Sequence, residues 1–393
     1  KYYGNSHTIV NFQNNGQEVR LYRKEKGQSY STPGEKYYLQ PSISWSFISS
    51  SNFAARYYPV GYIFDIAGSS IFVEKKDLPY ILGFMFSKLS SMFLKYINPT
   101  LNFQIGNVGA LPIIFDNTKR QQIDALVEQN IAISKDDWDS FETSWDFEQH
   151  PLIRFSNRNK GLVNYENIRK VEPITEVDKI SECFAKWKAY KEQQFNQLKA
   201  NEEELNRLVI EIYGLQDEMT PEVADKDITV AKADELREIK SLISYAVGCM
   251  FGRYSLDAKG LIYAGGDFDA NNYHTFAVDG DNAIPVLSDH YFADDIVERF
   301  NKFIKVAFGE AHYVENLTYI ANVLGKKNSQ STEQVLRDYF IKDFYKDHVQ
   351  MYQKHPIYWM FSSEKNNFNA LIYLHRYNKD TVNIVLNEYL REY

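Results

Sequence analysis

The stretch INPTLNFQIGNVGALPI, residues 97–113, contains an Asn-Pro step beside an aromatic residue and two glycines. An enzyme that methylates the amino group of an extruded adenine needs an Asn-Pro-Pro-aromatic tetrad. Its Asn accepts from the amine, and its aromatic ring stacks on the base. The tetrad that begins at Asn98 lacks the second Pro and the aromatic residue, and Phe103 lies too late to replace it. We therefore expect this stretch to be structural and not catalytic.

Other patterns that could hold a cofactor or a metal are incomplete. Gly265-Gly266 lies in an acidic loop with no clear helix after it, so it does not predict a site for S-adenosylmethionine. The run that starts at Asp267 begins like a calcium loop, but Asn272 stands where a Gly is needed and Val278 where a bidentate Glu is needed. The histidines and the two cysteines lack zinc-site spacing. The sequence thus predicts no catalytic, cofactor-binding or metal-binding residue in this chain.

Basic residues concentrate at the start of the chain. The formal net charge of the whole sequence is −8, which argues against a surface that coats DNA uniformly, because Lys and Arg drive phosphate binding by displacing counterions. Residues 1–60 nevertheless hold seven basic and three acidic residues, whereas residues 117–223 hold 14 and 21. Charge alone leaves two interpretations of the basic segment open, a solvated surface loop and a phosphate-binding surface.

The basic segment offers two kinds of candidate DNA-binding residue. Arg and Lys supply phosphate contacts, and an Arg can form paired hydrogen bonds with guanine in the major groove. Asn and Gln can form such pairs with adenine. The cationic candidates are Arg20, Arg23, Lys24, Lys26, Lys36 and Arg56, and the amide candidates are Gln13, Asn14, Asn15 and Gln28.

The elements that position these residues differ along the chain. Residues 8–12, 18–23, 42–50 and 61–66 are rich in β-branched and aromatic residues and are separated by Gly, Asn, Ser and Pro, which predicts short strands. Residues 78–97 carry apolar residues at helical spacing, so we expect one helix there, packed on the sheet. The start of the chain is therefore predicted to be a compact, mostly β module.

Helical patterns dominate after this module. Asp116 or Asn117 could cap a helix over residues 118–132. A longer helix is predicted from about Asp178 to Tyr213, followed by Gly214 in the usual C-terminal position. At 1.5 Å per residue it would be a rod of roughly 50 Å, which suits a spacer.

The last part of the sequence mixes helices and strands. Helices are predicted at 233–254, 293–309 and 331–353, a strand pair at 356–363 and 369–377, and a final helix at 379–393 inside which the chain is expected to stop. Asp294-Asp295 lies at the start of the second helix, where carboxylates cap a helix more often than they bind a metal. The predicted fold class is α+β, with a β-rich module (1–116), a long helical spacer (117–222) and a mostly helical C-terminal domain with a short strand pair (223–393).

Several blocks of sequence, in order over most of the chain, resemble one known family. They lie at 44–72, 98–113, 198–223, 287–310 and 338–377, and include SWSFISSSNFAARYYPVGYIFDIAGSSIF, NPTLNFQIGNVGALPI and LSDHYFADDIVERFNKFIKVAFGE. These blocks resemble the region that follows the catalytic domain in the adenine-specific DNA methyltransferases of BREX phage-defence systems, the PglX family. In that family an N-terminal domain carries the S-adenosylmethionine pocket and the Asn-Pro-Pro-Tyr loop.

The resemblance implies a division of labour between recognition and catalysis. Residues 1–116 would be a target-recognition module that reads double-stranded DNA. S-adenosylmethionine would be the cofactor of a longer parent enzyme and would not bind this chain, which is expected to be inactive alone. The ending GNVGALPI resembles the junction at which type I specificity subunits pass from recognition domain to helix, and Gly106 and Gly109 would permit tight turns there.

Partners and location follow as expectations. Double-stranded DNA is the expected partner, with other BREX subunits as further partners, in the bacterial cytoplasm. No apolar run approaches the roughly 18 residues of a membrane span. The alternative function is a protein-interaction scaffold, in which aromatic residues of the C-terminal domain dock other subunits, although such aromatics more often belong to a core. These residues are Tyr345, Tyr352, Tyr358 and Trp359.

Overall fold

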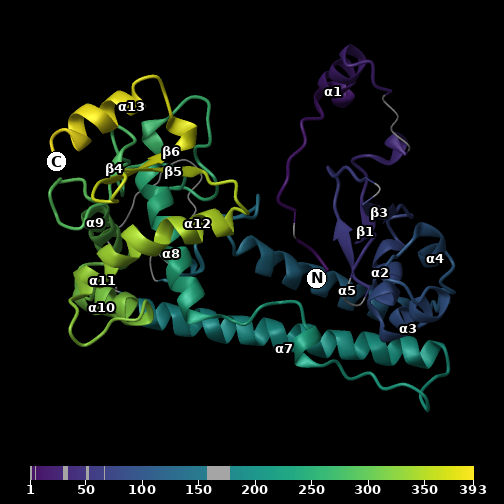
Figure 1. Cartoon of the computed structure of the whole chain (residues 1–393). Coiled ribbons are helices and arrows are strands. Elements are labelled where there is room, and N and C mark those ends of the chain that lie inside the picture. The colour runs from purple at the N-terminus through teal and green to yellow at the C-terminus, as the bar shows by residue number, and fades with distance from the viewer. Residues whose placement is uncertain (1, 5, 30–33, 50–52, 66, 157–177) are drawn as a thin grey trace. The chain divides into compact units, whose positions relative to one another are not determined.

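The computed structural model of the chain describes residues 2–4, 6–29, 34–49, 53–65, 67–156 and 178–393. The predicted α+β class is confirmed: helices predominate, beside two small antiparallel sheets (Figure 1). The chain folds as two compact units. The N-terminal unit comprises Lys1–Trp138 and Gln193–Ala231, and the C-terminal unit comprises Asp139–Glu192 and Lys232–Tyr393. Residues 117–222, the expected spacer, therefore contribute to both units.

The sheet of the N-terminal unit has three antiparallel strands. Strand β1 (Ser42–Ser46) lies between β2 (Ala55–Tyr58) and β3 (Gly68–Ile71). Successive side chains of a strand point to opposite faces, so Ile43 and Trp45 are buried together on one face and pack in the core that includes helix α2 (Leu78–Phe86). The sheet and α2 thus form the packed body of the predicted β-rich module.

Most of the predicted strand positions in this unit are wrong or too long. Residues 8–12 form no strand, and residues 18–23 lie in helix α1 (Gln13–Glu25). The strand predicted at 42–50 ends at Ser46, and the described part of 61–66 is irregular. The physical reason is that a short run such as EVRLYR satisfies the strand pattern and the helix pattern equally, so its period does not decide between them.

The helix predicted over residues 78–97 is broken into α2 and α3 (Lys88–Ile97). At Ser87 the backbone is extended, and its hydroxyl accepts from the Ser90 N–H at 3.2 Å while donating to the Phe84 carbonyl at 2.7 Å. Ser87 therefore ends one helix and caps the next, which is the role its short polar side chain favours. Gly106 and Gly109 lie in the short helix α4 (Ile105–Gly109) without positive φ, so the tight turns expected there are absent.

Two long helices agree with the predicted pattern. Helix α5 (Arg120–Asp139) follows a turn in which the Asp116 carboxylate accepts from the Thr118 N–H and hydroxyl, so Asp116 stabilises that turn and does not cap the helix itself. Helix α7 (Ile180–Ile212) ends at Gly214, whose φ is 66°. A short helix, α6 (Pro151–Arg154), precedes α7 in the chain.

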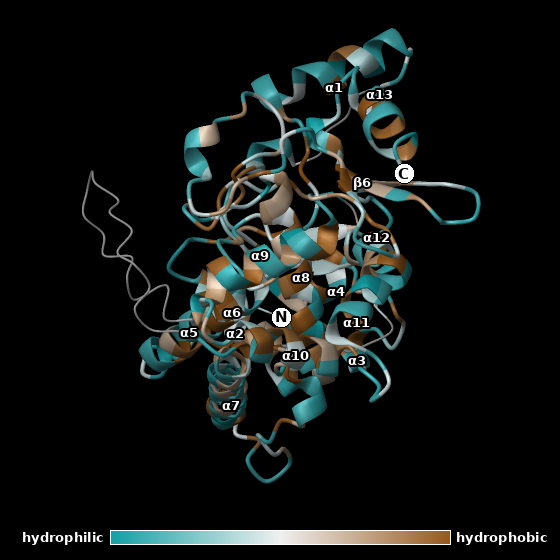
Figure 2. Cartoon of the chain, turned by 90° about the vertical axis from the view of Figure 1, so that its left-hand side faces the viewer, coloured by the Kyte–Doolittle hydropathy of each residue, from teal (hydrophilic) through white to brown (hydrophobic). Residues whose placement is uncertain are grey.

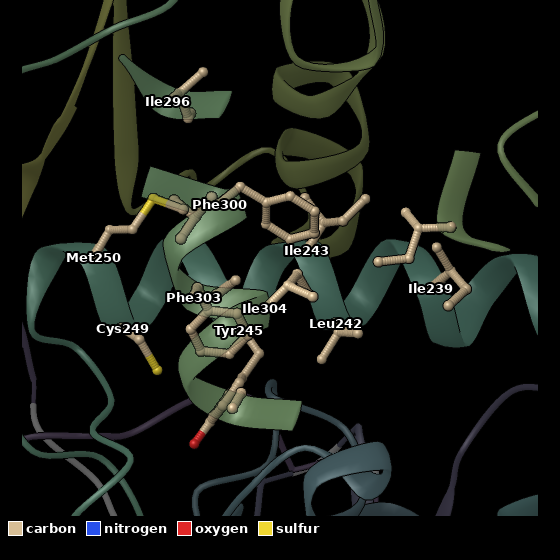
Figure 3. Packing of buried hydrophobic residues seen from close by; sticks show 14 of the residues in the cluster. Ile239, Leu242, Ile243, Tyr245, Cys249, Met250, Ile296, Phe300, Phe303 and Ile304 are labelled. Carbon is tan, nitrogen blue, oxygen red and sulfur yellow. The ribbon is translucent and has the colours of Figure 1, made fainter. Parts of the chain in front are cut away.

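The core of the C-terminal unit forms around α8 (Glu235–Phe251) and α9 (Ile296–Phe308). In Figure 3, Phe300, Phe303 and Ile304 of α9 lie against the buried face of α8. Capping side chains begin both helices, because Asp234 accepts from the Arg237 N–H and Asp295 accepts from the Val297 and Glu298 N–H groups. The predicted capping role of the Asp294-Asp295 pair is thus confirmed at Asp295.

The helix predicted at 331–353 and the predicted strand pair are present in the C-terminal unit, whereas the helix at Tyr313–Val323 and the strand at Ile284–Pro285 were not predicted. Helix α10 (Tyr313–Val323) precedes α11 (Thr332–Tyr339), which continues through a π-helical turn (Phe340–Phe344) into α12 (Tyr345–Met351). The second sheet has the order β4 (Ile284–Pro285), β6 (Asn369–Tyr373), β5 (Tyr358–Ser362). The final helix is α13 (Thr381–Ile384) with a π-helical extension, Val385–Leu390. Short 3-10 helices lie at Glu35–Tyr37, Asp225–Asp227, Ala270–Asn272 and Leu374–Arg376.

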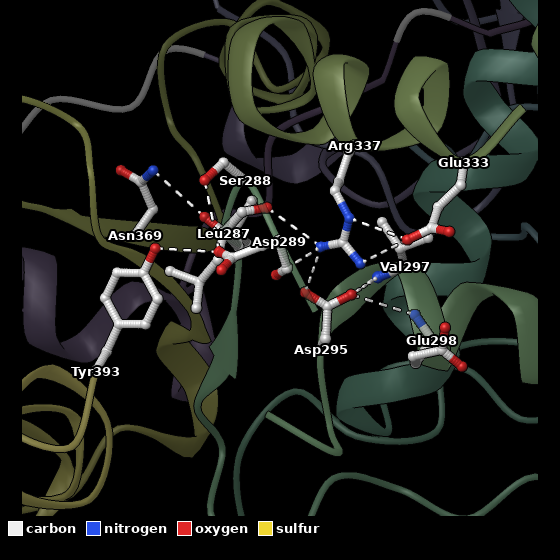
Figure 4. A network of polar contacts seen from close by, with 11 residues as sticks. Leu287, Ser288, Asp289, Asp295, Val297, Glu298, Glu333, Arg337, Asn369 and Tyr393 are labelled. Carbon is white, nitrogen blue, oxygen red and sulfur yellow. Dashed lines mark hydrogen bonds and ion pairs between the residues drawn. The ribbon is translucent and has the colours of Figure 1, made fainter. Parts of the chain in front are cut away.

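A buried ion pair joins α9 to α11 (Figure 4). The Arg337 guanidinium donates to the Asp295 carboxylate at 2.8 Å and to the carbonyls of Leu287 and Asp289. Glu333, one turn before Arg337 on α11, accepts from the same guanidinium. Burial raises the pKa of Asp295, while Arg337 acts in the opposite direction. The capping carboxylate of α9 is therefore held by a cation from another helix.

Membrane insertion has no candidate element among the described residues. No helix there combines the length and the apolar content that crossing a bilayer requires.

Candidate nucleic-acid interface

Helix α1 is built from a left-handed turn followed by right-handed helical turns. Asn14, Asn15 and Gly16 have φ values of 51°, 58° and 73°, a conformation that Asn and Gly adopt most readily. The Gly16 N–H donates to the Phe12 carbonyl at 3.2 Å and closes this turn. The sequence NNG therefore supplies the start of the helix, although sequence inspection indicated a strand.

The C-terminal end of α1 is closed by Gly27. Its φ is 65°, its N–H donates to the Lys24 carbonyl at 3.1 Å, and the Gln28 N–H donates to the Arg23 carbonyl at 2.8 Å. This closure fixes Arg23, Lys24 and Gln28 beside one another at the end of the helix, where cations are also favoured by the helix dipole.

The basic side chains of α1 share one side of the helix. At about 100° per residue, Arg20, Arg23 and Lys24 of α1 and its C-cap residue Lys26 fall within one arc, and the acidic residues Glu18 and Glu25 fall on the opposite side. Only Gly16 of α1 is buried, and the helix is largely teal in Figure 2, the colour of hydrophilic residues. In Figure 1 it stands apart from the sheet of its unit. Helix α1 thus presents a basic face, which we define as Arg20, Arg23, Lys24 and Lys26.

The members of the basic face differ in their contacts. Arg20 donates from Nε to the Asn15 carbonyl at 3.0 Å and forms an ion pair with Glu35. The Lys26 ammonium lies 5.6 Å from the centre of the Tyr22 ring. Arg23 and Lys24 are exposed, and neither has an ion-pair partner among the residues that the structure describes. Arg23 and Lys24 are therefore the cations of this face with the most freedom to meet an anion.

Most of the remaining candidates lie at the two ends of α1 or beside Glu35. Gln28 is exposed at the C-terminal end of α1. Lys36 is exposed and follows Glu35, the ion-pair partner of Arg20. The Lys36 ammonium lies 4.9 Å from the centre of the Tyr37 ring. Asn14 is exposed at the other end of the helix and donates to the Gln17 side chain at 3.2 Å. Gln13 and Asn15 are also exposed there.

Arg56 is placed differently from the other candidates. It lies half-buried on β2, opposite Ser44 of β1, on the face of the sheet away from Ile43 and Trp45. Its Nε is buried and makes no hydrogen bond within the described ranges. The structure therefore brings the basic face, Gln28 and Lys36 together, and places Arg56 on the sheet.

Sequence reasoning did not identify two residues of this surface, Glu35 and Leu21. Glu35 holds Arg20 and so connects the helix to the segment of Lys36. Leu21 and Tyr22 are exposed on the rest of the helix surface. A helical assignment of residues 17–25 would have revealed that the basic residues share a face; the left-handed NNG turn was the signal for it.

An acidic cluster in the C-terminal unit is the one candidate metal site among the described residues. One carboxylate oxygen from each of Asp279, Asp281 and Asp294 lies within 4.8 Å of the others. The Tyr389 hydroxyl lies 2.8 Å from an Asp281 oxygen and 2.6 Å from an Asp294 oxygen, and an Arg299 nitrogen lies 3.7 Å from Asp279. Burial raises the pKa of Asp279 to about 7, with Arg299 acting in the opposite direction. The cluster thus places three carboxylates beside one tyrosine hydroxyl and one cation.

Comparison with known proteins gives two extensive matches, although no protein-family model matches the chain. The adenine-specific methyltransferase PglX of Lacticaseibacillus casei (strain Zhang) is 42% identical over 398 residues, covering 99% of this chain and 32% of that protein. The adenine-specific methyltransferase BrxX of Escherichia coli O9:H4 (strain HS) is 34% identical over 427 residues, with the same two shares. The chain spans about a third of the length of these relatives. The resemblance seen in the sequence is confirmed, and the chain is PglX-like along nearly its whole length.

Proposed function

We propose that this chain is the DNA-recognition and scaffold portion of a site-specific N6-adenine DNA methyltransferase of a BREX phage-defence system. It reads the target duplex in the bacterial cytoplasm for a catalytic part outside residues 1–393, and that part binds S-adenosylmethionine. The names of the two relatives support the methyltransferase class. The observation that carries the recognition role is the exposed basic face of α1, with Arg23 and Lys24 lacking ion-pair partners among the described residues.

The geometry of α1 suits duplex DNA for two reasons. A single helix fits the major groove, which is about 12 Å wide. The basic face also separates cations from the acidic residues Glu18 and Glu25 of the same helix, so phosphates would meet positive charge on one side only. In this proposal Arg23, Lys24 and Lys26 bind phosphates or a guanine, while Gln28 and Asn14 read adenine.

Arg20 and Lys36 have supporting roles in the proposed interface. Arg20 is held by Glu35 and by the Asn15 carbonyl, so it fixes the helix to the segment that carries Lys36. Lys36 would extend the phosphate contacts beyond the helix. Arg56 would contact the backbone from the sheet, where its buried Nε lacks a hydrogen-bond acceptor among the described residues.

Charge reversal tests this function. The double variant Arg23→Glu, Lys24→Glu is expected to bind duplex DNA more weakly than the unmodified chain. Its plot of log affinity against log salt should be shallower by about one unit for each phosphate contact removed. Fluorescence anisotropy over a salt series measures both quantities.

A matched control uses the C-terminal unit. Lys342 and Lys346 are both exposed on one helical stretch, so Lys342→Glu, Lys346→Glu changes the net charge by the same amount. This control should retain the affinity and the salt slope of the unmodified chain. Equal behaviour of the two double variants would remove Arg23 and Lys24 from the interface.

The scaffold alternative finds less support in the structure. Tyr358 is buried, and Tyr345 and Tyr352 are half-buried with their rings beside His348. Trp359 alone among these four aromatics is exposed, on strand β5. Other BREX subunits are proposed as additional partners, without a defined docking residue.

A further inference from the structure

Two stretches of sequence without charged residues lie in the N-terminal unit, outside the proposed DNA interface. From Tyr96 to Phe115 and from Tyr37 to Ala55 the sequence has no Asp, Glu, Lys, Arg or His. The first of these stretches contains the Asn98-Pro99 step. Stretches of this length without charge are unusual in a chain of which 24% of the residues are charged.

Large apolar side chains are exposed on this surface. Tyr96 is 80% exposed, Ile48 65%, Ile105 64% and Leu101 59%, and Ile97 is also exposed. We define these five residues as the apolar patch. Single exposed apolar residues need no explanation, but a group of them on neighbouring segments marks an interaction site.

Backbone hydrogen bonds join the segments that carry the apolar patch. The Ser49 N–H donates to the Leu101 carbonyl at 3.0 Å, and the Phe103 N–H donates to the Phe47 carbonyl at 2.7 Å. Ile48 and Asn102 form an isolated antiparallel bridge between these two bonds. The segments around Ile48 and Leu101 are therefore fixed side by side.

Asn98 fixes the turn between the patch residues of α3 and Leu101. Its side-chain amide donates to the Asn102 carbonyl at 2.9 Å and to the Asn107 side chain at 3.0 Å, and its side-chain oxygen accepts from the Thr100 N–H. The Trp45 indole N–H holds the same segment from the sheet, through the Phe103 carbonyl at 2.8 Å. The apolar side chains thus project from an ordered backbone, which reduces the entropy that binding would cost.

We propose that the apolar patch is the surface on which the rest of the polypeptide docks. The inference rests on the proposed function, in which a catalytic part lies outside residues 1–393. DNA is a poor occupant, because phosphates require cations, and neither stretch holds one; Lys95 lies directly before the first of them. The two relatives are each about three times as long as the stretch they share with this chain, so most of such a polypeptide is available to cover the patch. The occupant is an uncharged, apolar surface of that remaining part.

Site-specific photo-cross-linking in the full-length methyltransferase tests this docking. A benzophenone side chain replaces Leu101 in one variant and Ile105 in another, and replaces Val60 in the control. Val60 is 70% exposed in the same unit. It follows the end of β2 at Tyr58, which pairs with Ser42 at the start of β1, whereas Ile48 follows the end of β1. Peptides from outside residues 1–393 should be cross-linked from positions 101 and 105 and not from position 60. Cross-links to DNA, to a second copy of the protein or to nothing would overturn the proposal.

Substitution gives a second readout. In the double variant Leu101→Asp, Ile105→Asp, docking would bury two charges without partners, so methylation should fall about tenfold or more. Duplex affinity should stay within about twofold, because the basic face is unchanged. A thermal melt of the 393-residue chain should also be unchanged, since both side chains are exposed. Unchanged methylation would contradict docking. Unchanged duplex affinity in the Arg23→Glu, Lys24→Glu variant would contradict the DNA-binding proposal and would leave docking untouched.

Discussion

Arg337 connects distant parts of the C-terminal unit through one buried side chain. Its side chain is 3% exposed, and it holds Asp295, whose side chain is 1% exposed, together with two backbone carbonyls (Figure 4). The capping role of Asp295 could be predicted from sequence, because an Asp directly before an apolar helical pattern is a local signal. The ion pair could not, since nothing local in the sequence pairs Asp295 with a residue two helices later.

Removal of Arg337 should destabilise the chain strongly. Arg337→Ala leaves the Asp295 carboxylate buried without its cation, and loss of one partner of a buried pair costs about 3–5 kcal/mol. Denaturant unfolding followed by circular dichroism measures the loss. The control is Lys346→Ala, whose side chain is 78% exposed and lies 3.9 Å from Asp343. It should change stability by less than about 0.5 kcal/mol, and a similar effect of both variants would contradict the structural role of Arg337.

His348 gives the C-terminal unit a predicted sensitivity to acid. Its Nε2 accepts from the Ile357 and Tyr358 N–H groups at 3.1 and 3.2 Å, so this nitrogen must be unprotonated. Burial lowers the pKa of His348 to about 3, and Arg253 acts in the same direction. An unfolded His has a pKa near 6.5. Between pH 6.5 and 3, His348 is therefore protonated in the unfolded chain and neutral in the folded chain. The stability that neutral His348 gives the folded chain is lost as the pH falls through this range.

The variant His348→Gln removes this titration. The free energy of unfolding of the unmodified chain, relative to that of the variant, should decrease by up to about 1.4 kcal/mol per pH unit below pH 6.5. Urea unfolding at several pH values gives both free energies. A constant difference between the unmodified chain and His348→Gln over pH 4–7 would show that His348 does not titrate as inferred.

At the scale of elements, long periodic segments were predictable and short ones were not. Helices α7, α8 and α9 and the β5–β6 pair lie where the pattern predicts them, because each is long or strongly patterned. Helix α1 was expected to be a strand, because EVRLYR is too short to distinguish the two periods and no core contact decides its structure. The candidate DNA-binding residues could be chosen from charge, but their common face depends on that helix and on the Glu35 contact.

The end of α7 depends on a conformation that Gly adopts easily. Gly214 has a φ of 66°. Its N–H donates to the Glu211 carbonyl, and the Leu215 N–H donates to the Ile210 carbonyl. Apart from Gly214 and its two chain neighbours, no described residue has a heavy atom within 4 Å of the position of an added Cβ, so Gly214→Ala tests backbone strain. It should destabilise the chain by about 1 kcal/mol.

Gly106 provides the matched control. It lies in α4 without positive φ, and an added Cβ would also meet open space. Gly106→Ala should therefore leave stability unchanged or raise it slightly, because Ala favours a helix over Gly. Thermal unfolding distinguishes the two variants, and an equal loss in both would contradict the assignment of strain to Gly214.

At the scale of the whole molecule, the N-terminal unit carries two proposed surfaces of different chemistry. The basic face of α1 is cationic, whereas the apolar patch consists of exposed uncharged residues. Because these chemistries suit different ligands, one unit can meet DNA and protein at separate places. Neither surface could be derived from the net charge of −8, which averages over a basic start and an acidic remainder.

The most direct test of DNA recognition is a map of the peptides that contact a duplex. The 393-residue chain is irradiated with double-stranded DNA that contains photoreactive thymine analogues, and the cross-linked peptides are identified by mass spectrometry. The proposed function predicts cross-links within residues 13–36, at the basic face and beside Lys36. Cross-links confined to residues 232–393, or no binding of the duplex at low salt, would contradict it.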